Sequence, residues 1–344
     1  MNLDNYFKEA VTKKASDIHL IVGQPITLRI DGKLVPIKGT ELSKSEAEKT
    51  ILSILTPLQK EKFAELKDLD FSYEINNGSR FRVNIFIEKD NYSLAARIIS
   101  SRIPTMDDID MPQVVYEMTR THQGLILITG PTGCGKSTSL AAMINLINNE
   151  KVANIITLED PVEFIFKSDK SIVRQRQLGT DMVTFASALK HVLRQDPDVI
   201  MVGEMRDLET IAATLTLAET GHLVLATLHT HNAGQTIDRI VDVFPPYQQN
   251  QIRLQLSMSL NGIVSQQLLP KIGGGRIAAR EILINTPAIS NIIRENKIPQ
   301  IKTAIQTSAD EGMVTLEQDL TRLLKDKIIE KETAEYYTSN LPKI

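Results

Sequence analysis

One octapeptide near the middle of the chain constrains the fold more than any other segment. Its residues, Gly130-Pro-Thr-Gly-Cys-Gly-Lys-Ser137, fit the pattern G-x-x-x-x-G-K-[ST]. It follows an apolar stretch at 125–129 and precedes apolar residues at helical spacing, from Leu140 to Ile147. A loop between a buried strand and a helix turns backbone N–H groups towards a phosphate, and the helix N-terminus adds positive potential. The segment predicts an α/β domain that binds the phosphates of a nucleotide.

Within this loop we expect Lys136 to reach the outer phosphates of ATP and the Ser137 hydroxyl to bind Mg²⁺. The other predicted nucleotide-binding residues are Gly130, Pro131, Thr132, Gly133, Cys134, Gly135 and Thr138. Cys134 is the single cysteine, which excludes an internal disulfide and a multi-cysteine zinc site. It could be a catalytic thiol, but we interpret it as a small side chain tolerated at a variable loop position.

Two further apolar strands end in carboxylates. One ends at Glu204, where an acidic group beside the phosphate loop can hold the waters of Mg²⁺. The other begins at Ile155 and runs into Glu159, Asp160 and Glu163. Each of these three carboxylates could orient or deprotonate an attacking water, and their spacing alone does not choose among them.

Histidines stand at both ends of another predicted strand, at His222 and His229, with His231 close by. A histidine just past the carboxyl end of a central strand faces the ligand crevice of an open α/β sheet. We therefore predict phosphate sensing. A zinc site on His229 and His231 is disfavoured because no cysteine and no obvious further ligand accompanies them.

The first 99 residues predict a separate α+β domain. Its expected elements are a helix at 3–14, strands at 18–22, 26–30, 71–75, 80–87 and 93–99, a helical stretch at 43–66 interrupted near Pro57, and turns at Asp31-Gly32 and Asn76-Asn-Gly78. Alternation in the fourth strand puts Arg80 and Arg82 on a polar face. Residues 100–112 hold two prolines and a charge cluster, which predicts a linker or hinge.

Residues 113–344 predict a mostly parallel sheet covered on both faces. The expected elements are strands at 125–129, 155–159, 199–203 and 223–227, helices at 187–194 and 208–219, then helices at 251–265, 287–296 and 314–325 with a short hairpin around 273–275.

The composition limits the possible partners. Lys and Arg total 39 against 42 Asp and Glu, aromatic residues are 5%, and there is no tryptophan. This counts against a nucleic-acid binder, which needs a basic surface or stacking side chains. Apolar stretches of about five residues are far short of the ~20 that a membrane helix needs, and the N-terminus has no secretion signal. We expect a cytoplasmic protein without direct membrane insertion.

Several segments, in the same order along the chain, resemble the PilT family of type IV pilus retraction ATPases, within the secretion ATPase superfamily. They are 15–20, 29–32, the phosphate loop, 157–164, 203–210, 221–231, 236–239, 243–245 and 288–295. The resemblance implies a RecA-like P-loop NTPase domain at 113–344 with a helical C-terminal region. It further implies a PAS-like N-terminal domain at 1–99, a hinge at 100–112, and a hexameric ring.

By the same resemblance, Glu163 is the preferred water-activating base and Glu204 organises Mg²⁺ through water. His222 and His229 sense the γ-phosphate. Arg82 and Arg97 of the N-terminal domain complete the site by neutralising charge on the transferred phosphoryl group; Arg80 and Arg102 are alternatives. The chain departs from the family at 88–93, where the usual Arg-Gly turn is replaced and an expected arginine is absent at Asp90.

The activity implied is a homohexameric ATPase that uses ATP and Mg²⁺ to power pilus retraction and twitching motility through interdomain rotation. Its expected partners are an inner-membrane pilus platform protein and, as an option, a paralogous pilus ATPase. It would act from the cytoplasm, peripheral to the inner membrane at the pilus base. The alternatives are an accessory retraction ATPase, a pilus assembly or type II secretion ATPase, and a nucleic-acid translocase. Assembly ATPases have a longer N-terminal region and many carry a four-cysteine zinc module, which argues against that reading.

Overall fold

The computed structural model divides into two units. The first comprises Met1–Arg102 with Pro161–Ile165, and the second comprises Ile103–Asp160 with Phe166–Ile344. The residues described are 2–30, 32–76, 78–99 and 102–339. Of the predicted linker, positions 100 and 101 lie outside the described residues, and positions 103–112 belong to the second unit. Positions 31 and 77 of the two predicted turns also lie outside them.

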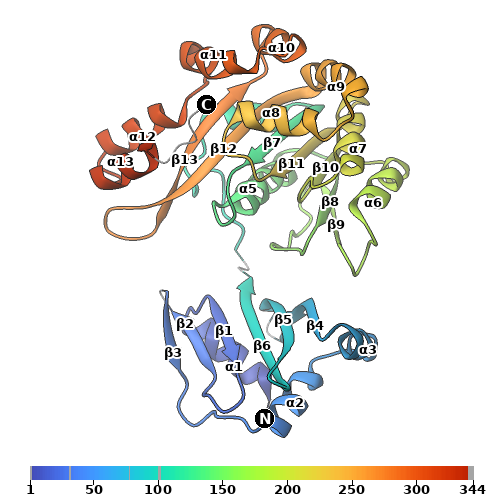
Figure 1. The fold of residues 1–344 in the computed structure, drawn as a ribbon, viewed down its shortest axis with the longest axis vertical. Coiled ribbons are helices and arrows are strands. Elements are labelled where there is room, and N and C mark those ends of the chain that lie inside the picture. Colours follow the sequence, from blue (N-terminus) through green and yellow to red (C-terminus); the bar gives the residue numbers. More distant parts are fainter. Residues whose placement is uncertain (1, 31, 77, 100–101, 340–344) are drawn as a thin grey trace. The chain divides into compact units, whose positions relative to one another are not determined.

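The first unit is a six-stranded antiparallel sheet with three helices (Figure 1). Its strand order is β3-β2-β1-β6-β5-β4. The elements are α1 (Leu3–Thr12), β1 (Asp17–Leu20), β2 (Thr27–Ile30), β3 (Lys33–Pro36), α2 (Lys44–Ser53), α3 (Pro57–Leu66), β4 (Asp68–Glu74), β5 (Arg80–Glu88) and β6 (Asn91–Ile99). Capping boxes start α2 at Ser43 and α3 at Thr56, which explains the interruption near Pro57.

Alternation in β5 builds the core of this unit. Phe81, Val83 and Ile85 are fully buried, whereas Arg82 on the other face is exposed. The ring of Phe81 stacks on Phe7 of α1 with centroids 4.3 Å apart. The predicted apolar and basic faces of this sheet are both present.

The second unit is built on a seven-stranded sheet of order β13-β12-β7-β11-β10-β8-β9. Six strands are parallel, and β13 pairs antiparallel to β12. The strands are β7 (Gly124–Thr129), β8 (Asn154–Glu159), β9 (Ile172–Gln177), β10 (Val199–Val202), β11 (Leu223–Leu228), β12 (Leu260–Pro270) and β13 (Arg276–Ile284). This confirms the predicted α/β class.

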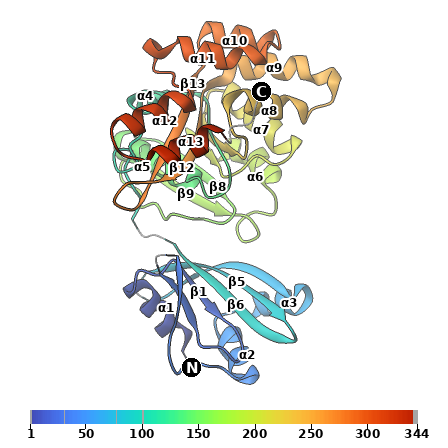
Figure 2. The same cartoon turned by 60° about the vertical axis from the view of Figure 1, so that its left-hand side comes forward.

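Ten α-helices in the described part of this unit accompany the sheet. They are α4 (Gln113–Arg120), α5 (Lys136–Glu150), α6 (Phe185–Val192), α7 (Leu208–Glu219), α8 (Ala233–Asp242), α9 (Pro246–Ser259), α10 (Pro287–Arg294), α11 (Ile301–Thr307), α12 (Leu316–Lys325) and α13 (Lys331–Ser339). Short 3₁₀ turns lie at Leu193–Gln195, Ile298–Gln300 and Ala309–Glu311. Figure 2 shows α9, α10 and α11 gathered at one end of the unit.

The predicted helix at 251–265 is wrong in its second half. The helix ends at Ser259, and β12 follows at once and runs to Pro270. A register shift falls between Leu260 and Gly262, and residues 262–266 are all buried because both faces of the strand are covered, so the strand lacks the alternation of a half-buried strand. The predicted short hairpin is therefore the end of two long strands (Figure 1). The edge strand β9 was not predicted, because its sequence, Ile-Val-Arg-Gln-Arg-Gln, is mostly polar.

Arg280 on β13 anchors the segment that precedes α4. Its side chain is 2% exposed, and its two terminal nitrogens donate to the carbonyls of Asp110 and Ile109 at 2.8 and 2.7 Å. Its backbone N–H donates to Asp319 at 2.8 Å. Met106 and Met111 of the same segment are buried. Residues 106–111 are therefore packed into the second unit.

Candidate active site

The phosphate loop follows β7 and leads into α5, as the sequence predicts. Gly130, Gly133 and Gly135 have φ values of +139°, +81° and +91°, which residues with a side chain rarely adopt. A Cβ on Gly130 would also lie 2.3 Å from the carbonyl oxygen of Gln266. These glycines are required by the conformation that turns backbone N–H groups inward.

Lys136 points back into this loop. Its ammonium donates to the carbonyls of Gly130 and Pro131 at 2.8 and 3.1 Å, and it lies 3.4 Å from Nδ1 of His229. His229 directly follows β11, the strand beside β7. The predicted lysine and sensor histidine are therefore side by side at the carboxyl edge of the sheet.

Glu204 lies at the same edge, two residues after β10. One of its carboxylate oxygens is 3.0 Å from Nε2 of His229, and the other is 2.7 Å from Arg206. Burial raises the pKa of Glu204, but the hydrogen bond and charge of Arg206, with His229 and Lys136, outweigh it and hold the pKa below its usual value. Glu204 is therefore an anion here, and Arg206 is a site residue that the sequence analysis did not single out.

The oxygen donors near this loop fit Mg²⁺. Ser137 supplies a hydroxyl at the start of α5, and each oxygen of the Glu204 carboxylate keeps a lone pair beyond its present partner. Mg²⁺ is usually held by one or two such oxygens together with substrate phosphates and water. No cluster of three His, Cys, Asp or Glu side chains able to hold a metal occurs within residues 2–339 as far as they are described, so the His229 and His231 pair gains no further ligand of these types.

The three acidic candidates after β8 are in different environments. Glu159 is buried, and its Oε1 accepts hydrogen bonds from Thr157 at 2.6 Å and Gln175 at 3.0 Å. Asp160 is exposed at the end of the strand. Glu163 is also exposed, in the segment Pro161–Ile165 that groups with the first unit. Burial and bonding give Glu159 a structural role and leave Asp160 and Glu163 as the water-activating candidates.

His222 is not brought to this edge. It precedes β11, and its Nδ1 lies 3.0 Å from the carbonyl of Leu217 and 3.3 Å from the Thr220 hydroxyl. The six residues of β11 separate it from His229, which at 3.2–3.4 Å per residue is roughly 20 Å. The side chain of His222 cannot touch a phosphate held by the loop of its own chain.

Arg82 and Arg97 face each other across β5 and β6 of the first unit. Arg82 is exposed, and Arg97 donates to Asp17 at 2.9 Å. Burial raises the pKa of Asp17, but hydrogen bonds from Ser16 and Arg97 outweigh it and hold the pKa below its usual value. The two predicted arginines thus form a single basic patch on one face of the sheet.

Cys134 is 3% exposed, and its thiol lies against Gly130, 2.7 Å from where a Cβ on that glycine would be. Burial raises the pKa of this thiol above its usual value. A neutral, buried thiol is a poor nucleophile. This supports the interpretation of Cys134 as a packing residue of the loop.

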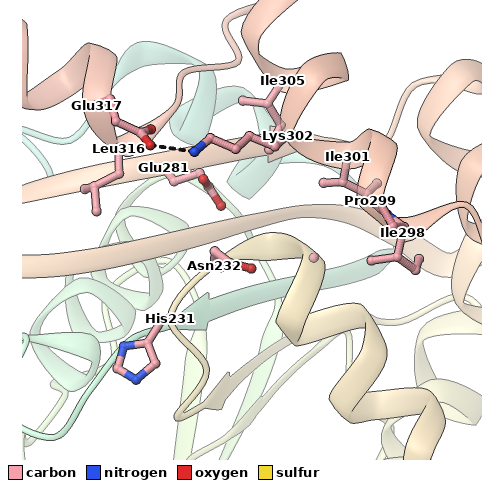
Figure 3. Close-up of a pocket in the computed structure, with 11 residues that line it drawn as sticks. His231, Asn232, Glu281, Ile298, Pro299, Ile301, Lys302, Ile305, Leu316 and Glu317 are labelled. Carbon is pink, nitrogen blue, oxygen red and sulfur yellow. Dashed lines mark hydrogen bonds and ion pairs between the residues drawn. The ribbon is translucent and has the colours of Figure 1, made fainter. Parts of the chain in front are cut away.

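The loop after β11 is held where it meets α8, beside a small cavity. The cavity has a volume of about 40 Å³ and is lined by His231, Asn232 and Glu281 together with residues of α11 and α12 (Figure 3). Glu281 accepts a hydrogen bond from the backbone N–H of Ala233 at 2.8 Å. At this cavity, β13 and the C-terminal helices contact the loop that follows β11 and contains His229 and His231.

Comparison with known proteins identifies the family of the chain. Residues 1–275 match the family model of type II/IV secretion system proteins. The type IV pilus retraction ATPase PilT of Pseudomonas aeruginosa is 45% identical over 334 residues, 97% of each chain. A twitching motility protein of Neisseria gonorrhoeae is 44% identical over 91% of this chain and 84% of its own length. The crystal structure of the pilus retraction motor PilT with bound ADP matches with a TM-score of 0.94 at 45% identity, covering 100% of this chain and 99% of that one.

The fold, the phosphate loop and these matches define an ATP-hydrolysing enzyme of the type II/IV secretion system protein family. Within that family the chain is a member of the PilT group of retraction ATPases. The predicted family, fold class and ATPase activity are confirmed. Among the residues that the structure describes, no helix is both long and apolar enough to span a bilayer.

Proposed function

We propose that residues 130–138 hold the phosphates of ATP, with Lys136 at the outer phosphates. The conformation of the three glycines and the position of the Lys136 ammonium support this assignment. The related PilT crystal structure contains ADP. Mg²⁺ would be held by Ser137 and, through water, by Glu204. When bound, it neutralises charge on the phosphates.

In hydrolysis, Glu163 accepts a proton from the attacking water, and Arg82 and Arg97 neutralise charge on the transferred phosphoryl group. His229 senses the γ-phosphate. The sensing role of His229 rests on one observation, which is that His229 contacts both Lys136 and Glu204. A phosphate that draws Lys136 outward removes one of these two partners of His229. His222 does not sense a phosphate held by the loop of its own chain, because it lies at the other end of β11.

At the level of the assembly, the proposal is a homohexameric motor that powers type IV pilus retraction and twitching motility. ATP turnover drives rotation of the 1–99 domain against the 113–344 domain, with the hinge on the N-terminal side of residues 106–111, because those residues are packed into the second unit. The ring acts on an inner-membrane pilus platform protein from the cytoplasm, at the pilus base. The names of the related pilus proteins support this function.

Purified variants test the chemistry. Glu163→Gln should lower kcat by roughly 10²- to 10⁴-fold with ADP binding retained, because only the proton acceptor is lost. Asp160→Asn and Glu159→Gln are the matched controls. Should Asp160→Asn lose turnover while Glu163→Gln keeps it, the base would be Asp160.

Deletion of the gene with pili imaged afterwards tests the motor function. Hyperpiliated, non-twitching cells support a principal retraction ATPase. Bald cells would identify an assembly ATPase, and piliated cells that still twitch when a second retraction ATPase is present would identify an accessory one. A nucleic-acid translocase would bind DNA with steep salt dependence.

A further inference from the structure

The strand β12 forms a wall beside the phosphate loop. Its parallel pairing with β7 sets Ser265 beside Thr129, whose hydroxyl donates to that of Ser265 at 2.8 Å. The next residue, Gln266, is thereby level with the first glycine of the loop. A Cβ on Gly130 would lie 2.3 Å from the backbone oxygen of Gln266, so the two backbones are in close contact. The loop therefore has no space to shift towards β12.

The side chain of Gln266 joins the loop to the helix that follows it. Gln266 is 2% exposed, its Nε2 donates to the carbonyl of Cys134 at 2.9 Å, and its Oε1 accepts from the hydroxyl of Ser139 at 2.9 Å. Cys134 is in the middle of the loop and Ser139 is in the first turn of α5. A buried amide is costly unless bonded, so these two bonds fix both its own position and that of the loop carbonyl.

The irregularity in β12 decides which glutamine does this. Successive side chains of a strand point to opposite faces, and one extra residue reverses the faces of all that follow. The extra residue falls between Leu260 and Gly262, so Gln266 faces α5 and the half-buried Gln267 faces the other side of the sheet. The chain thus provides a second glutamine, one position along, that lies on the other face.

We propose that Gln266 is a positioning residue for nucleotide binding, whose amide holds residues 130–135 in the conformation that presents their N–H groups to phosphate. The inference rests on the proposed nucleotide-binding role of this loop. Three glycines give the loop wide conformational freedom, and the amide restricts that freedom before the nucleotide arrives. Because the loop holds the phosphates in the ground state and the transition state alike, Gln266 acts on binding more than on turnover.

The first test compares Gln266→Met with Gln267→Met. Methionine keeps the volume of the side chain and removes both hydrogen bonds. We expect KM for ATP and Kd for ADP to rise about ten-fold in Gln266→Met, with kcat within about two-fold of wild type. Gln267→Met should leave both unchanged. A merely structural role would instead reduce the active fraction, which lowers kcat and leaves KM as it was.

The second test uses Cys134, the single thiol of the chain, as a probe of the loop without nucleotide. It is 3% exposed, so alkylation requires the loop to open. Gln266→Met should speed alkylation about ten-fold over Gln267→Met. Ser139→Ala keeps the bond to the Cys134 carbonyl and should raise both KM and the alkylation rate a few-fold; it decides the matter if Gln266→Met does not fold.

Folded Gln266→Met with wild-type KM and a wild-type alkylation rate would overturn the proposal, as would the same result for Ser139→Ala if only that variant folds. Failure of the proposed function is a separate outcome. It would appear as full ATPase activity in Lys136→Ala, and the nucleotide-free alkylation rates would still report on Gln266.

Discussion

Replacing Arg280 by methionine should release residues 109–110 from the second unit. The guanidinium is 2% exposed, and it donates to two main-chain carbonyls of that segment at 2.8 and 2.7 Å. Methionine fills a similar volume and cannot donate. Both carbonyls therefore lose a charged partner.

The magnitude follows from these bonds. Hydrogen bonds to a charged group contribute about 1.5–3 kcal/mol each, so two of them contribute about 3–6 kcal/mol. Burial lowers the pKa of Arg280, opposed by Asp319 and Asp110, so removal of the guanidinium recovers part of its desolvation cost. We expect the free energy of opening this segment to fall by about 2–3 kcal/mol in Arg280→Met. This corresponds to about a 30- to 150-fold increase in the equilibrium constant for opening.

Native-state proteolysis with thermolysin measures this opening, because the segment contains the apolar residues Met106, Ile109 and Met111 that the enzyme recognises. Arg276→Met is the matched control, since Arg276 lies on the same strand and is exposed. We expect cleavage at 103–112 to be faster in Arg280→Met by the factor above. Equal cleavage rates in the two variants would refute this role of Arg280.

Three further predictions concern single residues. Lys89 and Asp90 form a two-residue hairpin turn with φ of +49° and +57°, so Asp90→Gly should raise the free energy of unfolding by about 0.5–1 kcal/mol in urea titrations; a decrease would contradict this. Burial raises the pKa of Glu281, so its contribution is present below the unfolded pKa and lost as pH rises through the folded one. Glu281→Gln, which keeps an acceptor for Ala233, should match wild type in thermal unfolding at about pH 4 and exceed it at about pH 8; equal gains at both values would contradict the shift. Cys134→Ser should keep the ATPase activity of wild type, and its loss would show a chemical role for the thiol.

The sequence predicted the strand-loop-helix conformation at residues 124–150 well because its requirements are local. Gly130, Gly133 and Gly135 satisfy a backbone conformation within a few residues, and the strands and helices beside them have clear periodicity. The side-by-side placement of Lys136, Glu204 and His229 also followed, because the phosphate loop, Glu204 and His229 each come after the carboxyl end of a parallel strand.

Other parts depend on contacts distant in sequence. Burial of β12 on both faces hides its alternation, and Gln266 could not be connected to Cys134, 132 positions earlier, before the register of β12 and β7 was known. The sensor role of His222 followed from the family resemblance, although the sequence already places His222 and His229 at the two ends of one strand. The buried six-residue strand β11 confirms that the two histidines lie at opposite edges of the sheet.

If nucleotide held at residues 130–138 powers pilus retraction, loss of Lys136 should abolish retraction in the cell. Surface pili are counted in cells whose chromosomal gene carries Lys136→Ala. We expect hyperpiliated cells that do not twitch, equivalent to the deletion, with the variant protein at wild-type abundance. Wild-type pilus numbers and normal twitching in those cells would contradict it.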